Sequence, residues 1–221
     1  MSGMSRRDEL MSVMGVRTGT VHRPGKRLFD IVVSGLALLV LSPLLLTVVL
    51  AEWLTGGPAL YRQERVTLYG ERFNIMKFRT MVVGADRMGA NVSPAGDPRV
   101  TRLGRFLRRW YLDELPQLCN VLLGDMSLVG PRPETPEYVA LLSPDERRVL
   151  TVRTGIAGPS TLAFMNEADI LAAVPDPVAY YRDTMVHDRV GVDLAYLTHR
   201  SLAYDIGLLC RQLALIARRV W

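Results

Sequence analysis

Residues 112–133 read LDELPQLCNVLLGDMSLVGPRP, in which two adjacent carboxylates precede an apolar segment and an arginine stands between two prolines. Pro116 suits a first helical turn, where its missing N–H leaves no hydrogen bond unmade, so we expect a helix that ends at Gly124. Asp113 and Glu114 then lie where the helix dipole favours negative charge. The residues alone leave two interpretations open, an ordinary acidic helix cap or a reactive pair.

An uncharged, mostly apolar run of 21 residues extends from Ile31 to Ala51. A continuous helix of this length would reach about 32 Å, enough to cross the hydrocarbon core of a bilayer. A cleaved signal peptide is not expected, because the run is too long and no Ala-x-Ala site follows it. A buried core helix is the other alternative, and the uniform apolarity favours membrane association over it.

Ser42 and Pro43 lie at the middle of this run. Pro43 cannot donate to the carbonyl of Leu39, so we expect a kink. Basic residues flank both ends of the run, and the positive-inside rule favours the cytoplasmic side for each flank. A re-entrant helix would satisfy both flanks, and from the residues alone an ordinary span with a proline kink is equally compatible. The flanking residues are Arg17, Arg23, Lys26 and Arg27 before the run and Arg62, Arg65, Arg72 and Lys77 after it.

The 221 residues are enough for one domain with a sizeable core, and 49% of them are hydrophobic. The net charge of +5 indicates an anionic partner, for which nucleic acid, a phosphorylated substrate and anionic lipid all qualify. Cys119 and Cys210 lie in apolar helical patterns, so we expect buried free thiols in a reducing compartment. We divide the chain into a mobile basic tail (1–25), a membrane helix (26–56) and a catalytic domain (57–221).

Residues 61–66 and 73–81 have the composition of two strands joined near Tyr69 and Gly70. Strand alternation would place Lys77 and Arg79 on one face, either as a basic pair or as charges that guard a sheet edge. Helices are expected from Ser143 and from Asp176, where capping residues precede prolines. The basic amphipathic pattern over 208–221 fits a helix on anionic lipid, and equally a packed surface helix.

The sequence has no Walker loop, no Gly-x-Gly-x-x-Gly, no zinc-ligand spacing and no His-Glu-x-x-His. What remains is an acidic pair among many arginines beside a membrane segment. Phosphoryl transfer needs a nucleophile, a cation to bridge the phosphates and guanidinium groups that absorb negative charge. A carboxylate can itself attack phosphorus and form an acyl phosphate, which divides one difficult transfer into two.

The quoted stretch resembles the signature of the bacterial sugar transferase family, whose members are small monotopic phosphoglycosyl transferases. The resemblance continues, in family order, through Lys26–Asp30, Gln63–Val66, Lys77–Met81 and Asp97–Thr101. It implies an α+β fold with a re-entrant membrane helix broken at a Ser-Pro pair, a mostly helical domain with a small β-hairpin, and C-terminal amphipathic helices. It also implies the cytoplasmic face of the bacterial inner membrane.

The resemblance assigns Asp113 as the nucleophile that attacks a UDP-sugar, expels UMP and holds the sugar phosphate covalently. Undecaprenyl phosphate, a polyprenol carrier, would then accept the sugar phosphate and so begin glycan assembly. Glu114 would hold Mg²⁺ together with Asp113, since a divalent cation offsets the repulsion between carboxylate and pyrophosphate. Anionic membrane lipids are further expected partners, and nucleic acid is not.

Basic and polar positions of the family also have counterparts in this chain. Arg108 stands where family members contact phosphate, and Asp193 matches a polar site position. The resemblance implies anion binding by Lys77, Arg79 and Arg132 and places Arg153 near the substrate. The chain departs from the family over 153–160, where RTGIAGPS replaces the usual Lys/Arg-Pro-Gly-Ile-Thr-Gly followed by an apolar residue and Ala. This departure leaves the identity of the sugar open.

Two other classes of protein remain as alternatives. One is a non-enzymatic, membrane-tethered basic module that binds nucleic acid or anionic lipid, whose binding would fall steeply with salt regardless of Asp113. The other is a membrane phosphatase that uses Asp113 with water as the acceptor. Release of free sugar phosphate without lipid would identify the phosphatase.

Overall fold

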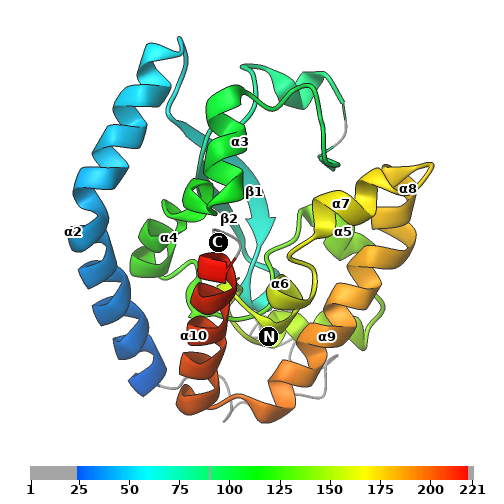
Figure 1. The fold of residues 1–221 in the computed structure, drawn as a ribbon. Coiled ribbons are helices and arrows are strands. Elements are labelled where there is room, and N and C mark those ends of the chain that lie inside the picture. The colour runs from blue at the N-terminus through cyan, green and yellow to red at the C-terminus, as the bar shows by residue number, and fades with distance from the viewer. Residues whose placement is uncertain (1–23, 90, 219–221) are drawn as a thin grey trace, which may run out of the picture.

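The computed structural model describes residues 24–89 and 91–218 (Figure 1). The tail expected over 1–25 therefore lies almost entirely outside the described residues. The fold is a mostly helical α+β arrangement with one long apolar helix, as the sequence predicts. It has two small sheets, of which the sequence predicts only the hairpin. In Figure 1 the long helix α2 stands at one side of the β-hairpin, and α5, α7, α8 and α9 lie at the opposite side.

Helix α2 runs without interruption from Pro24 to Leu54 and is bent near its middle (Figure 1). The bend agrees with the expected effect of Pro43, which leaves the carbonyl of Leu39 without its helical partner. The Ser42 hydroxyl donates to that carbonyl at 2.8 Å. Among the described residues α2 is the one helix long and apolar enough to cross a membrane, and 11% of its most apolar window is buried.

Both ends of α2 are bonded to the rest of the domain. At its N-terminal end the buried Asp30 carboxylate accepts from the Ser127 hydroxyl at 2.8 Å and from the Leu128 N–H at 3.2 Å. At its C-terminal end the buried Glu52 carboxylate lies 2.9 Å from the Arg79 guanidinium. One globular domain therefore holds the helix at two places.

The predicted hairpin is present as antiparallel strands β1 (Leu60–Val66) and β2 (Arg72–Phe78). It is shorter than predicted, because beyond Phe78 the chain leaves the sheet and Met81 pairs with Val100 instead. A second sheet pairs β3 (Ser127–Val129) in parallel with β4 (Gly155–Ala157). Gly155 permits this pairing, since a Cβ there would lie 2.1 Å from the Gly130 nitrogen.

The helices that follow the hairpin are short until the C-terminal pair. They are α3 (Arg102–Arg109), α4 (Gln117–Leu123), α5 (Pro136–Leu141), α6 (Pro159–Ala163), α7 (Glu167–Ala172), α8 (Pro177–Tyr180), α9 (Val186–His199) and α10 (Leu202–Arg218). The predicted helix end at Gly124 is confirmed, with φ of 99°. The segment after Ser143 is a 3-10 turn over Glu146–Thr151 rather than an α-helix, and a π-helical turn joins α8 to α9.

The quoted stretch supplies the centre of one hydrophobic core. Leu118, Val121, Met126 and Leu128 are buried there together with side chains of β2, α2 and α10. A second core lies beneath α7 and α9 and includes Leu171 and other apolar residues of these elements. The first core fixes α4, and with it the acidic turn that immediately precedes α4.

The two cysteines are free, but the prediction that both are buried is wrong. Cys119 is half-buried, whereas Cys210 is exposed. Helix α10 buries Asp205, Leu208 and Gln212, so the face carrying Cys210 points away from the domain. Apolar pattern alone could not identify this, because the buried positions of α10 include two polar residues.

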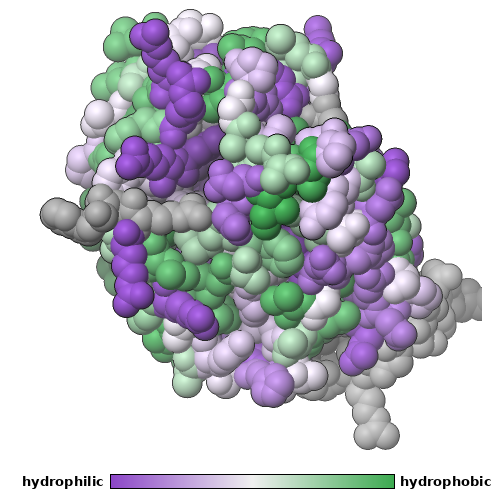
Figure 2. All heavy atoms as spheres, turned by 45° about the vertical axis from the view of Figure 1, so that its right-hand side comes forward, coloured by the Kyte–Doolittle hydropathy of each residue, from purple (hydrophilic) through white to green (hydrophobic). Residues whose placement is uncertain are grey.

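Exposed apolar side chains concentrate on α2, where Leu39, Val40 and Leu54 are 70%, 74% and 87% exposed. The face seen in Figure 2 differs, since hydrophilic and hydrophobic residues alternate over it in small groups. The surface of α2 is therefore a part of the described structure suited to contact with lipid.

Candidate active site

A cleft of about 840 Å³ lies between the hairpin, α3 and helices α5, α6, α7 and α9. Six of the predicted site residues line it: Lys77, Arg79, Arg108, Asp113, Glu114 and Arg132. Arg153 and Asp193 are not among the lining residues. The structure thus gathers in one cleft side chains that are up to 55 positions apart, from Lys77 to Arg132.

A 3-10 turn over Leu112–Glu114 carries the acidic pair into the cleft. The residue before the turn, Tyr111, has φ of 55°, a left-handed conformation that is unfavourable for a residue with a side chain. Its hydroxyl donates to the carbonyl of Met165 at 3.1 Å. Pro116 then starts α4, so the turn is confined between a fixed tyrosine and a helix packed in the core.

Glu114 is paired with cations on both sides. Its Oε1 lies 2.6 Å from Lys77 Nζ and 4.0 Å from Arg132 Nη1. Burial would raise the pKa of the Glu114 carboxyl, but the positive charges of Lys77 and Arg132 outweigh that effect and lower it. Glu114 is therefore ionised throughout the neutral pH range.

Asp113 has the opposite electrostatic character. Burial, together with the negative charge of Glu114, raises the pKa of its carboxyl from 3.8 to about 6, and the charges of Lys77 and Arg108 offset only part of this rise. The side chain is 9% exposed. In many active sites, two neighbouring carboxyl groups have well-separated pKa values and perform different chemical roles.

Arg108 is held by neutral partners. Its Nε donates to the Thr80 hydroxyl at 2.9 Å and its Nη1 to the Ser93 hydroxyl at 2.8 Å. Burial lowers the pKa of Arg108, while the charge of Asp113 acts to raise it. Neither hydrogen bond neutralises the guanidinium, so its charge is directed at the cleft in which Asp113 lies.

Asp193 lies behind Arg132. Its Oδ2 accepts from the Arg132 backbone N–H at 3.0 Å and from the Ser160 hydroxyl at 2.7 Å, and its Oδ1 accepts from the Ser160 N–H at 3.1 Å. The carboxylate therefore connects the segment of Arg132 to the loop that departs from the family pattern. Its contacts fix the backbone at Arg132.

Arg79 lines the cleft, but its guanidinium is directed at α2. It donates to the Glu52 carboxylate from Nε at 3.1 Å and from Nη2 at 2.9 Å, and it also bonds the Thr55 hydroxyl. The structure does not bring it to the carboxylates of Asp113 and Glu114. The expectation that Lys77 and Arg79 point together is wrong for the same reason, since Lys77 bonds Glu114.

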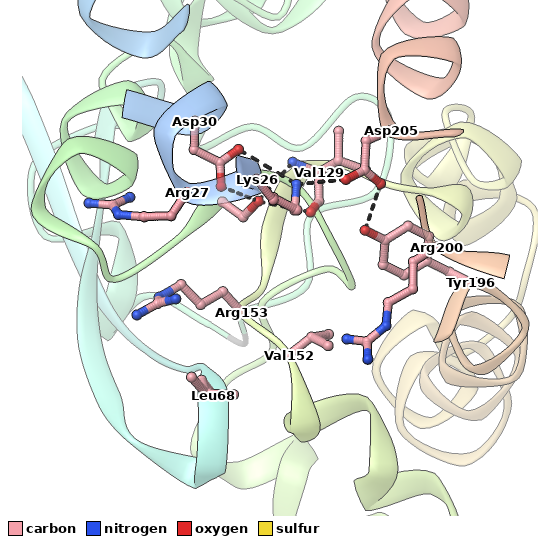
Figure 3. Close-up of a pocket in the computed structure, with 11 residues that line it drawn as sticks. Lys26, Arg27, Asp30, Leu68, Val129, Val152, Arg153, Tyr196, Arg200 and Asp205 are labelled. Atoms are coloured by element: carbon pink, nitrogen blue, oxygen red, sulfur yellow. Dashed lines mark hydrogen bonds and ion pairs between the residues drawn. The ribbon is translucent and has the colours of Figure 1, made fainter. Parts of the chain in front are cut away.

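Arg153 lies in a separate hollow of about 60 Å³, shown in Figure 3. Its Nε donates to the carbonyl of Gly124 at 2.7 Å. Arg27 bonds the same end of α4, at the carbonyl of Leu122, at 2.9 Å. Cations at the C-terminus of a helix stabilise it, so these two arginines support α4 from the end opposite to the acidic turn.

Sequence reasoning missed a second group of ionisable residues that line the cleft: Arg65, Glu167, Tyr181 and Arg189. Glu134 lies beside this group, since its carboxylate accepts from the Tyr181 hydroxyl and lies 3.7 Å from the Arg65 guanidinium. Arg189 is 2% exposed, and its Nη1 lies 2.8 Å from Glu167 Oε2. Glu134 could have been suspected, because it directly follows the quoted stretch. Arg189 had no local signal, since it stands in a helix whose pattern resembles an ordinary surface helix.

The described residues contain no group of three carboxylate, histidine or cysteine side chains that could hold a metal ion. Asp113 and Glu114 nevertheless offer two carboxylates side by side in the cleft. Mg²⁺ is commonly bound by one or two carboxylates, with substrate phosphates and water completing its shell. The pair fits that kind of site once a phosphorylated substrate is bound.

An acidic pair among half-buried cations, in a cleft whose wall is bonded through Arg79 to an exposed apolar helix, is typical of a membrane-associated protein that binds phosphates. The comparison with known families agrees with this class. The model of the bacterial sugar transferase family matches residues 21–219, and the chain belongs to that family.

Several relatives have described activities. The chain is 38% identical over 190 residues to the UDP-glucose:undecaprenyl-phosphate glucose-1-phosphate transferase of Caulobacter vibrioides, with 84% of this chain and 67% of the relative covered. It is 35% identical over 209 residues to the undecaprenyl-phosphate galactose phosphotransferase of Salmonella typhimurium, with 88% of this chain and 40% of that protein covered. It is 34% identical to the exopolysaccharide production protein ExoY of Sinorhizobium fredii, with 86% and 85% covered. The chain thus spans less than half of the Salmonella relative.

Proposed function

We propose that this protein transfers a sugar 1-phosphate from a UDP-sugar to undecaprenyl phosphate through a covalent intermediate on Asp113. The observation that carries the proposal is the placement of Asp113 in the cleft, with a raised pKa, beside an ionised Glu114 and facing the charge of Arg108. A buried carboxylate with a raised pKa is a stronger base and nucleophile than an exposed one. The names of the relatives supply the class of donor and acceptor.

In the first step, a carboxylate oxygen of Asp113 attacks the phosphorus that carries the sugar. A new P–O bond forms to Asp113, and the bond from that phosphorus to the bridging oxygen breaks. UMP leaves with that oxygen and its electron pair. Arg108 and Arg132 would stabilise the negative charge that spreads over the phosphoryl oxygens, as guanidinium groups do in other phosphoryl transfers.

In the second step, an oxygen of undecaprenyl phosphate attacks the same phosphorus and the bond to Asp113 breaks. The products are undecaprenyl diphosphate sugar and a free Asp113 carboxylate. The acceptor phosphate lies at the level of lipid headgroups, so the depth of the cleft relative to the membrane has to be fixed. The contacts at both ends of α2 support this, because they fasten the apolar helix to the domain that carries the cleft.

Asp113 and Glu114 would hold Mg²⁺ together with the donor pyrophosphate, and the ion would offset repulsion between the carboxylates and the phosphates. Lys77 keeps Glu114 ionised and so preserves its ability to bind a cation. Glu114 would also orient the incoming lipid phosphate. Arg79 forms part of the cleft wall, but this proposal gives it no direct bond to substrate, because its guanidinium is bonded to Glu52.

We further propose that α2 is re-entrant and enters and leaves the cytoplasmic leaflet of the bacterial inner membrane. A straight span would carry the two ends of the helix to opposite sides of a hydrocarbon core about 30 Å thick. Asp30, near one end, and Glu52, near the other, are both bonded within the same domain. The bend at Pro43 and the basic residues on both flanks support the same topology.

Single cysteines introduced as Ser2→Cys and as Arg62→Cys, at an exposed position, are both expected to react with a membrane-impermeant maleimide added to the outside of inverted membrane vesicles. The background for this experiment is a chain in which Cys119 and Cys210 are replaced by serine. Equal labelling of both sites in inverted vesicles and of neither in intact cells would support the re-entrant topology. Labelling of the two sites from opposite sides would overturn it.

The proposed reaction predicts UMP release from at least one UDP-sugar when undecaprenyl phosphate is present, with a rate that rises with pH. Because the pKa of Asp113 is raised to about 6, most of this carboxyl is protonated at pH 5, and the rate should be about tenfold lower there than at pH 7. Initial rates over a panel of UDP-sugars and a pH series measure both. Absence of release from every donor, or a rate unchanged down to pH 5, would contradict the proposal.

A further inference from the structure

One part of the cleft contains buried hydrogen-bonding atoms without partners. The Oγ1 atoms of Thr135 and Thr161 and the Nε of Arg189 are buried and have no hydrogen-bond partner among the described residues. All three residues line the cleft, and their exposed fractions are 4%, 6% and 2%. A buried polar atom left unpaired costs about 1–3 kcal/mol, and folded proteins satisfy such atoms with water or a ligand.

These atoms belong to elements packed at one end of the cleft, which we call the helical lobe. It is formed by Thr135, Thr161, Phe164, Glu167, Tyr181 and Arg189. In Figure 1 its helices lie on the side of the hairpin away from α2. The lobe is therefore remote from the surface suited to lipid, which makes it a poor place for the chain of the acceptor.

The side chains of the helical lobe are held rigidly. Arg189 Nη1 donates to Glu167 Oε2 at 2.8 Å and to the Tyr181 hydroxyl at 3.4 Å, and its guanidinium lies 5.5 Å from the centroid of the Phe164 ring. The Tyr181 hydroxyl in turn donates to the Glu134 carboxylate at 3.0 Å. Tyr181 begins the π-helical turn, a local irregularity found often at functional sites. These contacts hold the Arg189 guanidinium, with its unpaired Nε, in one position.

The charges of the helical lobe differ from those around Arg108. Arg189 is paired with Glu167, and Arg65 lies 3.7 Å from Glu134, so each of these cations has a carboxylate beside it. Arg108 is bonded to neutral hydroxyls instead. A phosphate group is therefore favoured near Arg108, whereas carboxylates and hydroxyls suit a neutral group that carries several hydroxyls.

We propose that the helical lobe binds the sugar of the donor, with Thr135, Thr161 and Glu167 hydrogen-bonded to its hydroxyls. This inference rests on the proposed function, which supplies the UDP-sugar. Removing the hydroxyl of Thr161 would leave a buried sugar hydroxyl without a partner, and such mismatches discriminate strongly between substrates. The lobe therefore determines which sugar the protein accepts.

Binding to a chain that cannot react tests this proposal. In an Asp113→Asn background, Thr161→Val is expected to raise the Kd of the preferred UDP-sugar about tenfold and to change the Kd of UMP less than twofold. Titration calorimetry with UDP-glucose, UDP-galactose, UDP-N-acetylglucosamine, UDP-N-acetylgalactosamine and UMP measures this. Thr198→Val, at an exposed position of α9, is the matched control, and Thr161→Ser should retain most of the affinity.

Equal weakening of UMP and UDP-sugar binding would assign the lobe to the nucleotide and overturn the proposal, as would unchanged binding of every UDP-sugar. Thr161→Val removes an unpaired hydroxyl and should not lower the melting temperature; if it does not fold, Thr135→Val provides the same test.

Selective loss of UDP-sugar binding without UMP release by the unmutated chain would refute the proposed activity alone. UMP release with equal efficiency by the unmutated chain and the Thr161→Val single variant would refute the sugar site alone.

Discussion

Replacement of Asp113 by asparagine is expected to abolish UMP release and, at the same time, to make the folded protein more stable. Loss of the nucleophile should lower the rate by a factor of about 10⁴ or more. The gain in stability follows from the pKa of Asp113, which burial raises from 3.8 to about 6. Since the pKa is raised in the folded state, the ionised carboxylate destabilises the fold as the pH rises through 6, and asparagine carries no such charge.

The size of this gain follows from the same shift. A rise of about two units corresponds to about 3 kcal/mol, which for a chain of this length is about 6–12 °C in melting temperature. The gain should be fully present at pH 8 and nearly absent at pH 3, below the unfolded-state pKa of 3.8, where the carboxyl is mostly neutral in both the folded and the unfolded state. Thermal unfolding of the detergent-solubilised protein at the two pH values, beside the UMP assay, measures both effects.

Asp145→Asn is the matched control, because Asp145 is exposed and lies away from the cleft, so neither activity nor stability should change. Intact-mass measurement adds a direct observation, since the unmutated chain mixed with donor alone should gain the mass of one sugar phosphate. A variant Asp113→Asn that still releases UMP, or an adduct located on another residue, would refute the assignment of the nucleophile. A variant that is inactive and less stable would refute the electrostatic account of the cleft.

Local signals in the sequence predict much of the fold around the acidic pair. Pro116 and Gly124 mark the two ends of α4, and alternation around the turn at Tyr69 and Gly70 predicts the hairpin. The acidic pair and the arginine between prolines stand in one stretch of 22 residues, so their proximity followed from short chain separation. The resemblance to a family then indicated which distant cations join them.

The rest of the site depends on packing between distant segments. Strands β3 and β4 have three residues each, too few for a recognisable alternation, and they pair across 25 intervening residues. Arg189 reaches the cleft because the core beneath α7 and α9 buries that side of the helix. Arg79 turns away from Lys77 because a buried carboxylate on α2 attracts it. None of these contacts can be predicted from the local composition of the sequence.

Glu52 links the membrane helix to the hairpin, and its replacement by alanine is expected to destabilise the protein by about 3–5 kcal/mol, because the buried Arg79 guanidinium would lose its partner. This corresponds to a melting temperature lower by about 6–20 °C. The paired replacement of Glu52 and Arg79 by methionine removes both charges and should recover most of the loss. Thermal unfolding of the unmutated chain, Glu52→Met, Arg79→Met and the methionine pair in one detergent completes the cycle, with Glu52→Ala measured beside them.

The activity of the pair then decides what Arg79 does. If Arg79 only fastens α2 to β2, the stable pair should release UMP at a rate within about threefold of the unmutated chain. If its guanidinium also contacts phosphate, the pair should fold and yet lose at least about tenfold in rate, the cost of one charged hydrogen bond. Destabilisation by the pair as large as that by Glu52→Ala would contradict the buried ion pair as the fastening between the membrane helix and the cleft.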